Sequence, residues 1–297
     1  MCGIVGLFLK DKGMEPQLGA LLSDMLVSLT DRGPDSAGIA IYGAGEGGGA
    51  KVTVQSARPE VDFPGLDDAL SVSLRTPVTV TVKANHAVVA GGVDGAALKA
   101  AAAAARPGLR FMSEGQAIEI YKEVGLPRTV VDRFGLAGAA GTHGIGHTRM
   151  ATESAVTTMG AHPFSTGPDQ CLVHNGSLSN HNNMRRELIR KGLTFETEND
   201  TEVAAAYISA RLAEGCNLGE ALEGTLQDLD GFFTFVVGTR HGFGVVRDPI
   251  ACKPAVMAET GRYVAFGSEY RAMARLPGIA EARVWEPEPA RVYFWEH

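Results

Sequence analysis

Short apolar runs and helix-like periodicities follow one another along most of this chain. Runs bounded by turn residues predict buried strands over Ile4–Leu9 and Gly38–Tyr42. Between these strands, apolar residues recur every three or four positions from Pro16 to Leu29, which predicts an amphipathic helix. The same periodicity predicts later helices over Asn182–Lys191, Thr201–Ala213 and Leu218–Asp228.

The last quarter of the chain carries a strand pattern throughout. Its apolar runs are short, rich in Phe, Val and Tyr, and separated by turn residues. Many short strands combined with a few amphipathic helices predict an α+β fold in which layered sheets are covered by helices. The late strands are predicted over Phe232–Gly238, Phe243–Arg247, Lys253–Ala258, Tyr263–Gly267 and Arg291–Trp295.

The stretch from about residue 43 to residue 141 differs from the rest. It opens with a glycine-rich run, and Val52–Val54 after that run is typical of a strand. Because no helix follows the glycines, a flexible loop fits them better than a phosphate-binding loop. Helices are predicted over Ala100–Ala105 and Gln116–Val124. No internal repeat is visible, so we interpret the stretch as an insertion within one domain spanning residues 2–297.

Composition excludes several classes of function. With 297 residues and 45% hydrophobic content the chain can bury a core, and its net charge of −7 argues against a nucleic-acid surface. No apolar stretch approaches the roughly 20 residues of a membrane span, and no secretory signal is visible, so we expect no membrane partner. The four cysteines show no paired spacing, which favours a cytoplasmic location.

Cys2 is the strongest candidate for a reactive nucleophile in this sequence. Removal of Met1 would leave Cys2 with a thiol and a free α-amine on the same residue. The thiolate is the reactive form of cysteine, and an adjacent base makes it available near neutral pH. The α-amine can be that base, because its ordinary pKa is near 8. On this residue alone, however, a cysteine without a catalytic role is the more frequent interpretation.

Five further segments combine charged, histidine and glycine residues. Taken singly, each has a structural interpretation: a capped turn near Arg32, a hairpin turn at His174-Asn175-Gly176, and a helix N-cap at Asp200. Their common order along the chain is the more informative observation. The segments are Arg32–Gly38, Gly146–Thr152 (a strand ending in a turn), His162–Phe164, His174–Leu178 and Asn199–Glu202.

In this order the segments resemble the class II glutamine amidotransferases, whose glutaminase domain belongs to the N-terminal-nucleophile hydrolases. That family begins its mature chain with Cys-Gly-Ile, as Cys2-Gly3-Ile4 does here, and carries Arg-Gly-x-Asp-Ser, Gly-His-x-Arg, His-Asn-Gly and Asp-Thr-Glu in the same sequence. Its closing motifs are similar to Arg247-Asp248-Pro249, Lys253-Pro254 and Phe266–Glu269. The resemblance implies a four-layer αββα sandwich, with residues 43–141 as an inserted segment.

The resemblance also implies roles in hydrolysing the side-chain amide of L-glutamine. Cys2 would attack the amide carbon while its α-amine moves the proton. The Asn175 side chain and the Gly176 N–H would form the oxyanion hole. Arg149 would pair with the α-carboxylate of glutamine, and Asp200 would hold its α-ammonium group.

Three further residues, Arg32, Thr152 and His174, complete the set of substrate-binding residues that the resemblance implies, with Arg32 in a supporting role near the nucleophile.

The sequence departs from the family at Met150, where many relatives carry an aromatic residue, and at Glu153. Methionine still offers an apolar wall. The acidic Glu153 could weaken glutamine binding. The histidines and cysteines are too scattered for a metal site, so we expect no metal.

A glutaminase produces ammonia, and relatives pass it to a second active site. No dinucleotide or phosphate-loop motif is present, so we expect no cofactor in this chain and a separate synthase subunit in a hetero-oligomer. Ser113-Glu114-Gly115 followed by Ile118–Gly125 resembles the amidotransferase subunits of N-methylglutamate synthase and other glutamate-synthase-like enzymes, whose partner chains are expected to hold flavin and an iron–sulfur cluster. Two alternatives stay open: a self-contained amidohydrolase for another γ-glutamyl compound, and a non-catalytic assembly subunit.

Overall fold

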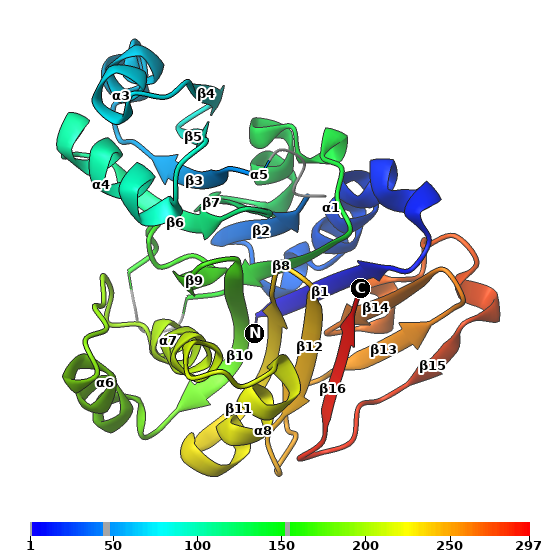
Figure 1. The fold of residues 1–297 in the computed structure, drawn as a ribbon. Helices are drawn as coiled ribbons and strands as arrows, with labels where there is room; N and C mark the ends of the chain where they lie inside the picture. Colours follow the sequence, from blue (N-terminus) through cyan, green and yellow to red (C-terminus); the bar gives the residue numbers. More distant parts are fainter. Residues whose placement is uncertain (1, 44–47, 152–154) are drawn as a thin grey trace.

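Two antiparallel sheets face each other, and helices cover both outer faces (Figure 1). The structure is a computed structural model that describes residues 2–43, 48–151 and 155–297. The larger sheet has the strand order β15 (Arg283–Trp285), β13 (Val256–Glu259), β14 (Tyr263–Gly267), β1 (Gly3–Leu9), β8 (His143–Arg149), β2 (Ser36–Tyr42) and β7 (Ile118–Val124). The smaller sheet has the order β16 (Val292–Glu296), β12 (Gly242–Arg247), β11 (Gly231–Gly238), β10 (Gln170–Leu178) and β9 (Phe164–Gly167).

The four layers confirm the expected αββα sandwich. An apolar core lies between the sheets, with Ile4, Val173 and Phe266 among its fully buried members. Separate cores join each sheet to its own helices. No helix in the described part of the chain is long and apolar enough to cross a membrane. The large sheet is covered by α1 (Leu18–Ser28) and α5 (Pro127–Phe134), and the small sheet by α6 (His181–Arg190), α7 (Asp200–Ala213) and α8 (Leu218–Asp228).

Strand β1 runs through the middle of the large sheet, paired with β14 on one side and β8 on the other. Its side chains alternate between two cores: Val5 and Leu7 pack against the helices, whereas Ile4 and Phe8 face the other sheet. All seven residues are buried, which explains why the strand reads as one continuous apolar run. This strand starts immediately after Cys2, so the nucleophile candidate lies at the start of a fully buried strand.

Much of the inserted segment forms a third, smaller sheet with its own core (Figure 1). The strand predicted at Val52–Val54 and the helix predicted at Ala100–Ala105 are confirmed within longer elements. Gly45 and Gly47 of the glycine-rich run lie outside the described residues. The strand order is β4 (Val78–Lys83), β5 (His86–Gly91), β3 (Ala50–Gln55) and β6 (Arg110–Gly115), with α2 (Pro59–Asp62), α3 (Leu66–Leu74) and α4 (Gly95–Ala105) beside them.

The helix predicted over Gln116–Val124 is wrong, because Ile118–Val124 forms the edge strand β7. Gln, Glu, Lys and Ala favour helices, and they misled the prediction. A strand forms instead of a helix because both faces of the strand become buried. Ile118 and Ile120 enter the core between the sheets, whereas Tyr121 packs under α1 and α5. The following helix α5 then covers β7, so this part of the segment belongs to the large sheet.

The other predicted elements are confirmed within a few residues at their ends. The helix predicted from Pro16 starts later, at Leu18, after a 3₁₀ turn over Lys12–Gln17. The strand predicted over Lys253–Ala258 is shifted, because β13 starts at Val256 and residues 253–255 form a loop. Strand β15 was not predicted; its three residues are too few to show a period.

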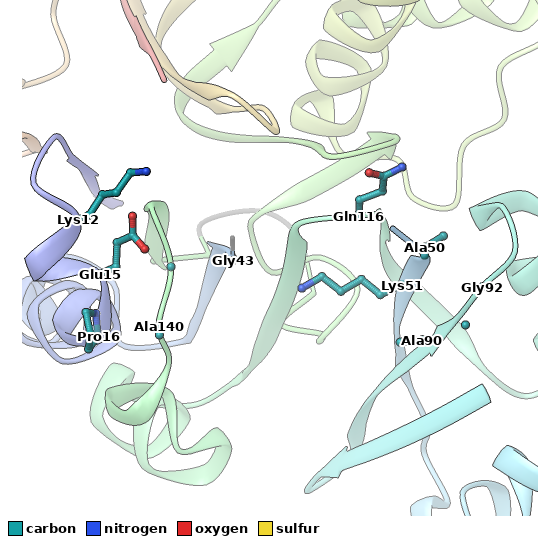
Figure 2. Close-up of a pocket in the computed structure, with 13 residues that line it drawn as sticks. Lys12, Glu15, Pro16, Gly43, Ala50, Lys51, Ala90, Gly92, Gln116 and Ala140 are labelled. Atoms are coloured by element: carbon teal, nitrogen blue, oxygen red, sulfur yellow. The ribbon is translucent and has the colours of Figure 1, made fainter. Parts of the chain in front are cut away.

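A cleft of about 670 Å³ separates the inserted sheet from the start of the chain (Figure 2). Lys12 and Glu15 line one side, and Lys51 and Gln116 line the other. The Lys51 ammonium group pairs with Glu119 of β7 at 2.8 Å. Thus the inserted sheet lies against the large sheet at β7 while an open space separates it from the first helical turns.

Asp169 joins the inserted sheet to the small sheet. Its buried carboxylate accepts hydrogen bonds from the backbone N–H groups of Gln116, Ala117 and Ile118 at 2.8–3.0 Å. Its own N–H donates to the Glu114 carbonyl at 2.8 Å. A carboxylate that is buried and accepts several N–H bonds is costly to replace, because the donors would lose their partner.

We therefore expect Asp169→Asn to lower the free energy of unfolding by about 1–2 kcal/mol, because the amide keeps only one acceptor oxygen and loses the charge. Asparagine tolerates the positive φ of 49° at this position, so backbone strain does not change. Urea denaturation followed by circular dichroism measures the difference. Asp24→Asn, on the exposed side of α1, is the matched control and should change stability little. Equal effects of the two substitutions would contradict this role for Asp169.

Candidate functional site

The ends of β1, β8 and β10 and the start of α7 meet around a cleft of about 580 Å³. Most of the predicted site residues lie on this cleft, although they are up to about 200 positions apart in the sequence. Arg32 lies behind Cys2 instead, and Thr152 and Glu153 lie outside the described residues. The predicted residues that line the cleft are Cys2, Arg149, His174, Asn175, Gly176 and Asp200.

The backbone of Cys2 is held by two side chains from different parts of the chain. The Cys2 carbonyl accepts a hydrogen bond from Arg32 Nε at 2.9 Å and one from Asn175 Nδ2 at 3.3 Å. The Cys2 Sγ atom lies 4.0 Å from the Met150 carbonyl oxygen. The thiol is therefore half-buried at the cleft while its own peptide group is fixed behind it.

Arg32 in turn needs a counter-charge, because its side chain is only 8% exposed. Its Nη1 donates to Glu269 Oε1 at 2.6 Å, and this hydrogen bond lowers the pKa of Glu269. The neighbouring Ser268 accepts from the Ile4 N–H through Oγ and donates its own N–H to the Ile4 carbonyl, both at 2.9 Å. The closing motif Ser268-Glu269, to which the sequence assigned no role, thus secures the first residues of β1.

Asn175 and Gly176 lie inside strand β10, not in a hairpin turn. The hairpin interpretation is therefore wrong. Gly176 pairs with Phe233 of β11 and has a φ of 151°. A Cβ atom at this position would lie 1.9 Å from the Phe232 carbonyl oxygen, so only glycine fits. Glycine here lets β10 approach β11 closely and carries the Asn175-Gly176 peptide to the wall of the cleft.

Arg149 ends strand β8 at the cleft. Its Nη1 donates to the Ala155 carbonyl at 3.4 Å. Asp35 supports this end of the strand: its N–H donates to the Arg149 carbonyl at 3.1 Å, and its carboxylate accepts from the Ala151 N–H at 2.8 Å. The side chain of Met150 is 37% exposed beside the cleft, where it supplies the expected apolar surface.

Asp200 is the first residue of α7, and the N-cap is Asn199, whose side chain accepts from the Thr201 N–H at 2.9 Å. The N-cap prediction for Asp200 is therefore wrong by one residue. Burial raises the pKa of the Asp200 carboxyl, but the His174 ring and the Leu178 N–H outweigh burial and bring that pKa to about 2. The carboxylate is therefore ionised at neutral pH.

Three buried histidines, His147, His162 and His174, cluster at the cleft, and the rings of His162 and His174 contact the same hydroxyl. Thr201 Oγ1 is 2.8 Å from His162 Nε2 and 3.1 Å from His174 Nδ1. The His147 and His162 rings stack with centroids 4.0 Å apart, and His147 Nε2 bonds to the His174 carbonyl at 3.0 Å. Burial lowers the pKa of His147 to about 3 and that of His162 well below its ordinary value, so both rings are neutral.

The sequence places these histidines in the family's motifs but does not identify Thr201 as the partner that His162 and His174 share. Thr201 follows Asp200 in the Asp-Thr-Glu motif, and that was the one signal available. Glu202, the third member, accepts from the backbone N–H groups of Glu196 and Thr197 at 2.7–2.8 Å and so fixes the loop before α7. Within the described part of the chain, no group of three or more His, Cys, Asp or Glu side chains is arranged to hold a metal ion.

The cleft therefore carries opposite charges on different walls. Arg149 supplies a cation at the end of β8, and Asp200 supplies an anion at the start of α7. Glu198 and Lys253 add a further charge of each sign. A free α-amino acid, with its carboxylate and ammonium groups, has the complementary charges.

Comparison with known proteins agrees with this geometry. A family model described as "Glutamine amidotransferase domain" matches residues 147–275. The chain is 69% identical over 298 residues to the glutamine amidotransferase-like protein GlxB of Rhizobium meliloti, with 100% of this chain and 99% of that protein covered.

Solved structures show the same fold. The glutamine phosphoribosylpyrophosphate amidotransferase of B. subtilis, in complex with ADP and GMP, matches with a TM-score of 0.63 and 20% identity. A structure described as the allosteric regulatory enzyme of purine biosynthesis matches with a TM-score of 0.65 and 20% identity. In both cases the match covers 99% of this chain and 47% of the other, so this chain spans about half the length of those proteins. The near-complete match to a relative at 69% identity, together with the stacked-sheet fold, shows that the chain belongs to the class II glutamine amidotransferase family, whose glutaminase domain has the N-terminal-nucleophile hydrolase fold.

Proposed function

We propose that this chain hydrolyses the side-chain amide of L-glutamine through a thioester on Cys2 and delivers the ammonia to a partner synthase. The observation that supports it most is the convergence on one cleft of Cys2, the Asn175-Gly176 pair and the oppositely charged Arg149 and Asp200. These groups supply a nucleophile, hydrogen-bond donors and a means of orienting an amino acid.

In the proposed reaction, removal of Met1 leaves the α-amine of Cys2 as the base. The amine takes the thiol proton, directly or through a water, and the Cys2 sulfur forms a bond to the amide carbon. The proton then passes to the departing nitrogen, the C–N bond breaks, and ammonia leaves. Water hydrolyses the thioester to release glutamate and restore the thiol. No step consumes an oxidant or a reductant.

The oxyanion formed during the attack needs donors that are already in place. Asn175 Nδ2 carries two hydrogens, and one of them is used on the Cys2 carbonyl. The same contact places the amide nitrogen next to the nucleophile residue, so its second hydrogen is a candidate donor to the oxyanion. The Gly176 N–H is the second candidate, held at the cleft by the close packing of β10 on β11.

The identity of the synthase that receives the ammonia is part of the same proposal. The resemblance of Ser113–Gly115 and Ile118–Gly125 favours N-methylglutamate synthase or a glutamate-synthase-like complex, in which flavin and an iron–sulfur cluster would be held by other chains. GlxB, the 69% identical relative, is described by its name as a glutamine amidotransferase-like protein and does not identify an acceptor.

Labelling tests the nucleophile. We expect the glutamine-directed electrophile diazo-oxo-norleucine to add one covalent label at Cys2, with Met1 absent from the labelled protein, because the proposed base is a free α-amine. Peptide mass spectrometry locates the label. The control is Cys252→Ser, which removes an exposed thiol and should leave labelling unchanged. A label on Cys171, Cys216 or Cys252 would falsify the assignment of Cys2.

Two substitutions test the recognition of the amino acid. Arg149→Lys keeps the charge but loses the planar fork, and Asp200→Asn removes the negative charge. Each should raise the KM for glutamine by about 10- to 100-fold, the loss expected for a charge-assisted hydrogen bond. Arg190→Lys, on the exposed side of α6, is the control for the first change. Steady-state glutaminase assays measure KM, and circular dichroism checks folding. Unchanged KM values in both variants would mean that glutamine is not bound between these residues.

Glutaminase activity measured with and without the synthase subunits tests whether glutamine hydrolysis is coupled to the synthase. We expect the isolated chain to hydrolyse glutamine slowly and to accelerate when its synthase subunits and acceptor are added, because free ammonia release would waste glutamine. Ammonia production by the purified chain, compared with that of the complex isolated from its native source, measures this. A chain that turns over at full rate alone, with nothing co-purifying, would instead be a self-contained amidohydrolase.

A further inference from the structure

Residues 155–163 form one wall of the cleft, through Ala155, Thr157, Gly160 and His162. They contain no strand or helix, so their position depends on side chains from elsewhere. Two of these side chains are neighbours on β7, the edge strand of the large sheet. Successive residues of a strand point to opposite faces, so the pair holds the wall from both faces of the sheet edge.

Lys122 holds the wall from the face between the sheets. Its side chain is almost fully buried, and its ammonium group donates to the carbonyls of Met159, Ala161 and Pro163 at 3.4, 2.8 and 3.1 Å. An ammonium group has three hydrogens, and each has a carbonyl here. Burial lowers the pKa of Lys122 to about 8, so the group is charged through most of the neutral range.

Glu123 holds the wall from the other face and also contacts the inserted sheet. Its Oε1 accepts from the Thr158 hydroxyl and from the Val124 N–H, the latter at 2.8 Å. Its Oε2 accepts from Asn85 Nδ2 at 2.6 Å. Glu123 and Asn85 are each 9% exposed, so water does not replace these bonds easily.

Asn85 lies in the β4–β5 turn and is itself fixed on two sides. Its Oδ1 bonds to His86 Nδ1 at 3.0 Å, and its carbonyl accepts from the Ser56 N–H at 2.9 Å. The turn is therefore anchored to the neighbouring end of β3. A continuous set of hydrogen bonds runs from the inserted sheet through Asn85, Glu123 and Thr158 to the wall of the cleft.

We propose that Asn85 and Glu123 are positioning residues for glutamine: the inserted sheet sets the position of residues 155–163 through them and thereby sets the affinity of the cleft. This inference rests on the proposed function. The wall contacts the glutamine-binding side directly, because Arg149 Nη1 donates to the Ala155 carbonyl. The insertion is thus part of the active site's support, and a molecule that displaced the β4–β5 turn would alter glutamine binding by the same contacts.

The test uses the full chain and three variants at the contact. Asn85→Ala removes the donor to Glu123 and should raise the KM for glutamine about three- to tenfold with little change in kcat. Asn85→Asp opposes two carboxylates and should raise KM further. Combining Asn85→Asp with Glu123→Gln exchanges donor and acceptor, and should return KM to within about twofold of the original value.

The matched control is Ser71→Ala, which removes a hydrogen bond to the Val78 N–H at 2.9 Å, at the end of β4 far from the turn. It should lower the melting temperature comparably while leaving KM unchanged. Hydrogen–deuterium exchange of the peptide covering residues 155–163 gives a readout that does not need activity. It should rise in Asn85→Ala and not in Ser71→Ala.

The outcomes separate this inference from the proposed function. Exchange that is unchanged in Asn85→Ala overturns the inference whether or not the chain hydrolyses glutamine. Raised exchange with an unchanged KM also overturns it, because the wall would then not govern binding. If the unmodified chain neither hydrolyses glutamine nor is labelled at Cys2, the proposed function fails and with it the effect on glutamine, while the exchange result still reports the contact itself.

Discussion

The geometry of the cleft depends on the fixed start of strand β1. Arg32 and Asn175 hold the Cys2 carbonyl from two elements, and Ser268 holds Ile4 from a third. These bonds tie Cys2 to a central strand, so the thiol is presented at a defined place. The buried Arg32 is tolerated because its Nη1 pairs with Glu269 and its Nε donates to the Cys2 carbonyl. An arginine buried without such partners would destabilise the fold.

Differences in burial and in hydrogen-bond partners decide which side chains of the site are charged. His147 and His162 are enclosed and remain neutral, whereas Asp200 keeps its charge because N–H and imidazole groups face it. Neutral rings can hold Thr201 and the strands together without adding charge to the cleft. The charges that face the cleft then come from residues at element ends, such as Arg149 and Asp200. A rigid neutral support beneath a few fixed charges is what the orientation of a small zwitterion requires.

Much of the fold could be predicted because hydrophobic burial has a local signature. Strand β1 appears as an unbroken apolar run and α8 as a periodic segment, and each is found where it was predicted. The ends of helices and strands were predicted less accurately, because they depend on backbone capping and 3₁₀ turns. Helix α1, for example, begins only after a 3₁₀ turn. Site residues could be named from their motifs, but their mutual contacts could not. Arg32 and Glu269 are 237 positions apart, and nothing local in the sequence links them.

The segment wrongly predicted as a helix, residues 116–124, also carries two side chains that hold a wall of the cleft. In a helix, Lys122 and Glu123 would both be ordinary surface residues on an exposed face. In the edge strand β7 they point to opposite faces, and each finds buried partners in the same wall of the cleft. Their polarity, which favoured a helix in the sequence, is needed because residues 155–163 have carbonyl and hydroxyl groups that no sheet or helix satisfies. A polar pair in a strand buried on both faces therefore marks a place where irregular backbone is held, and here that backbone lines the cleft.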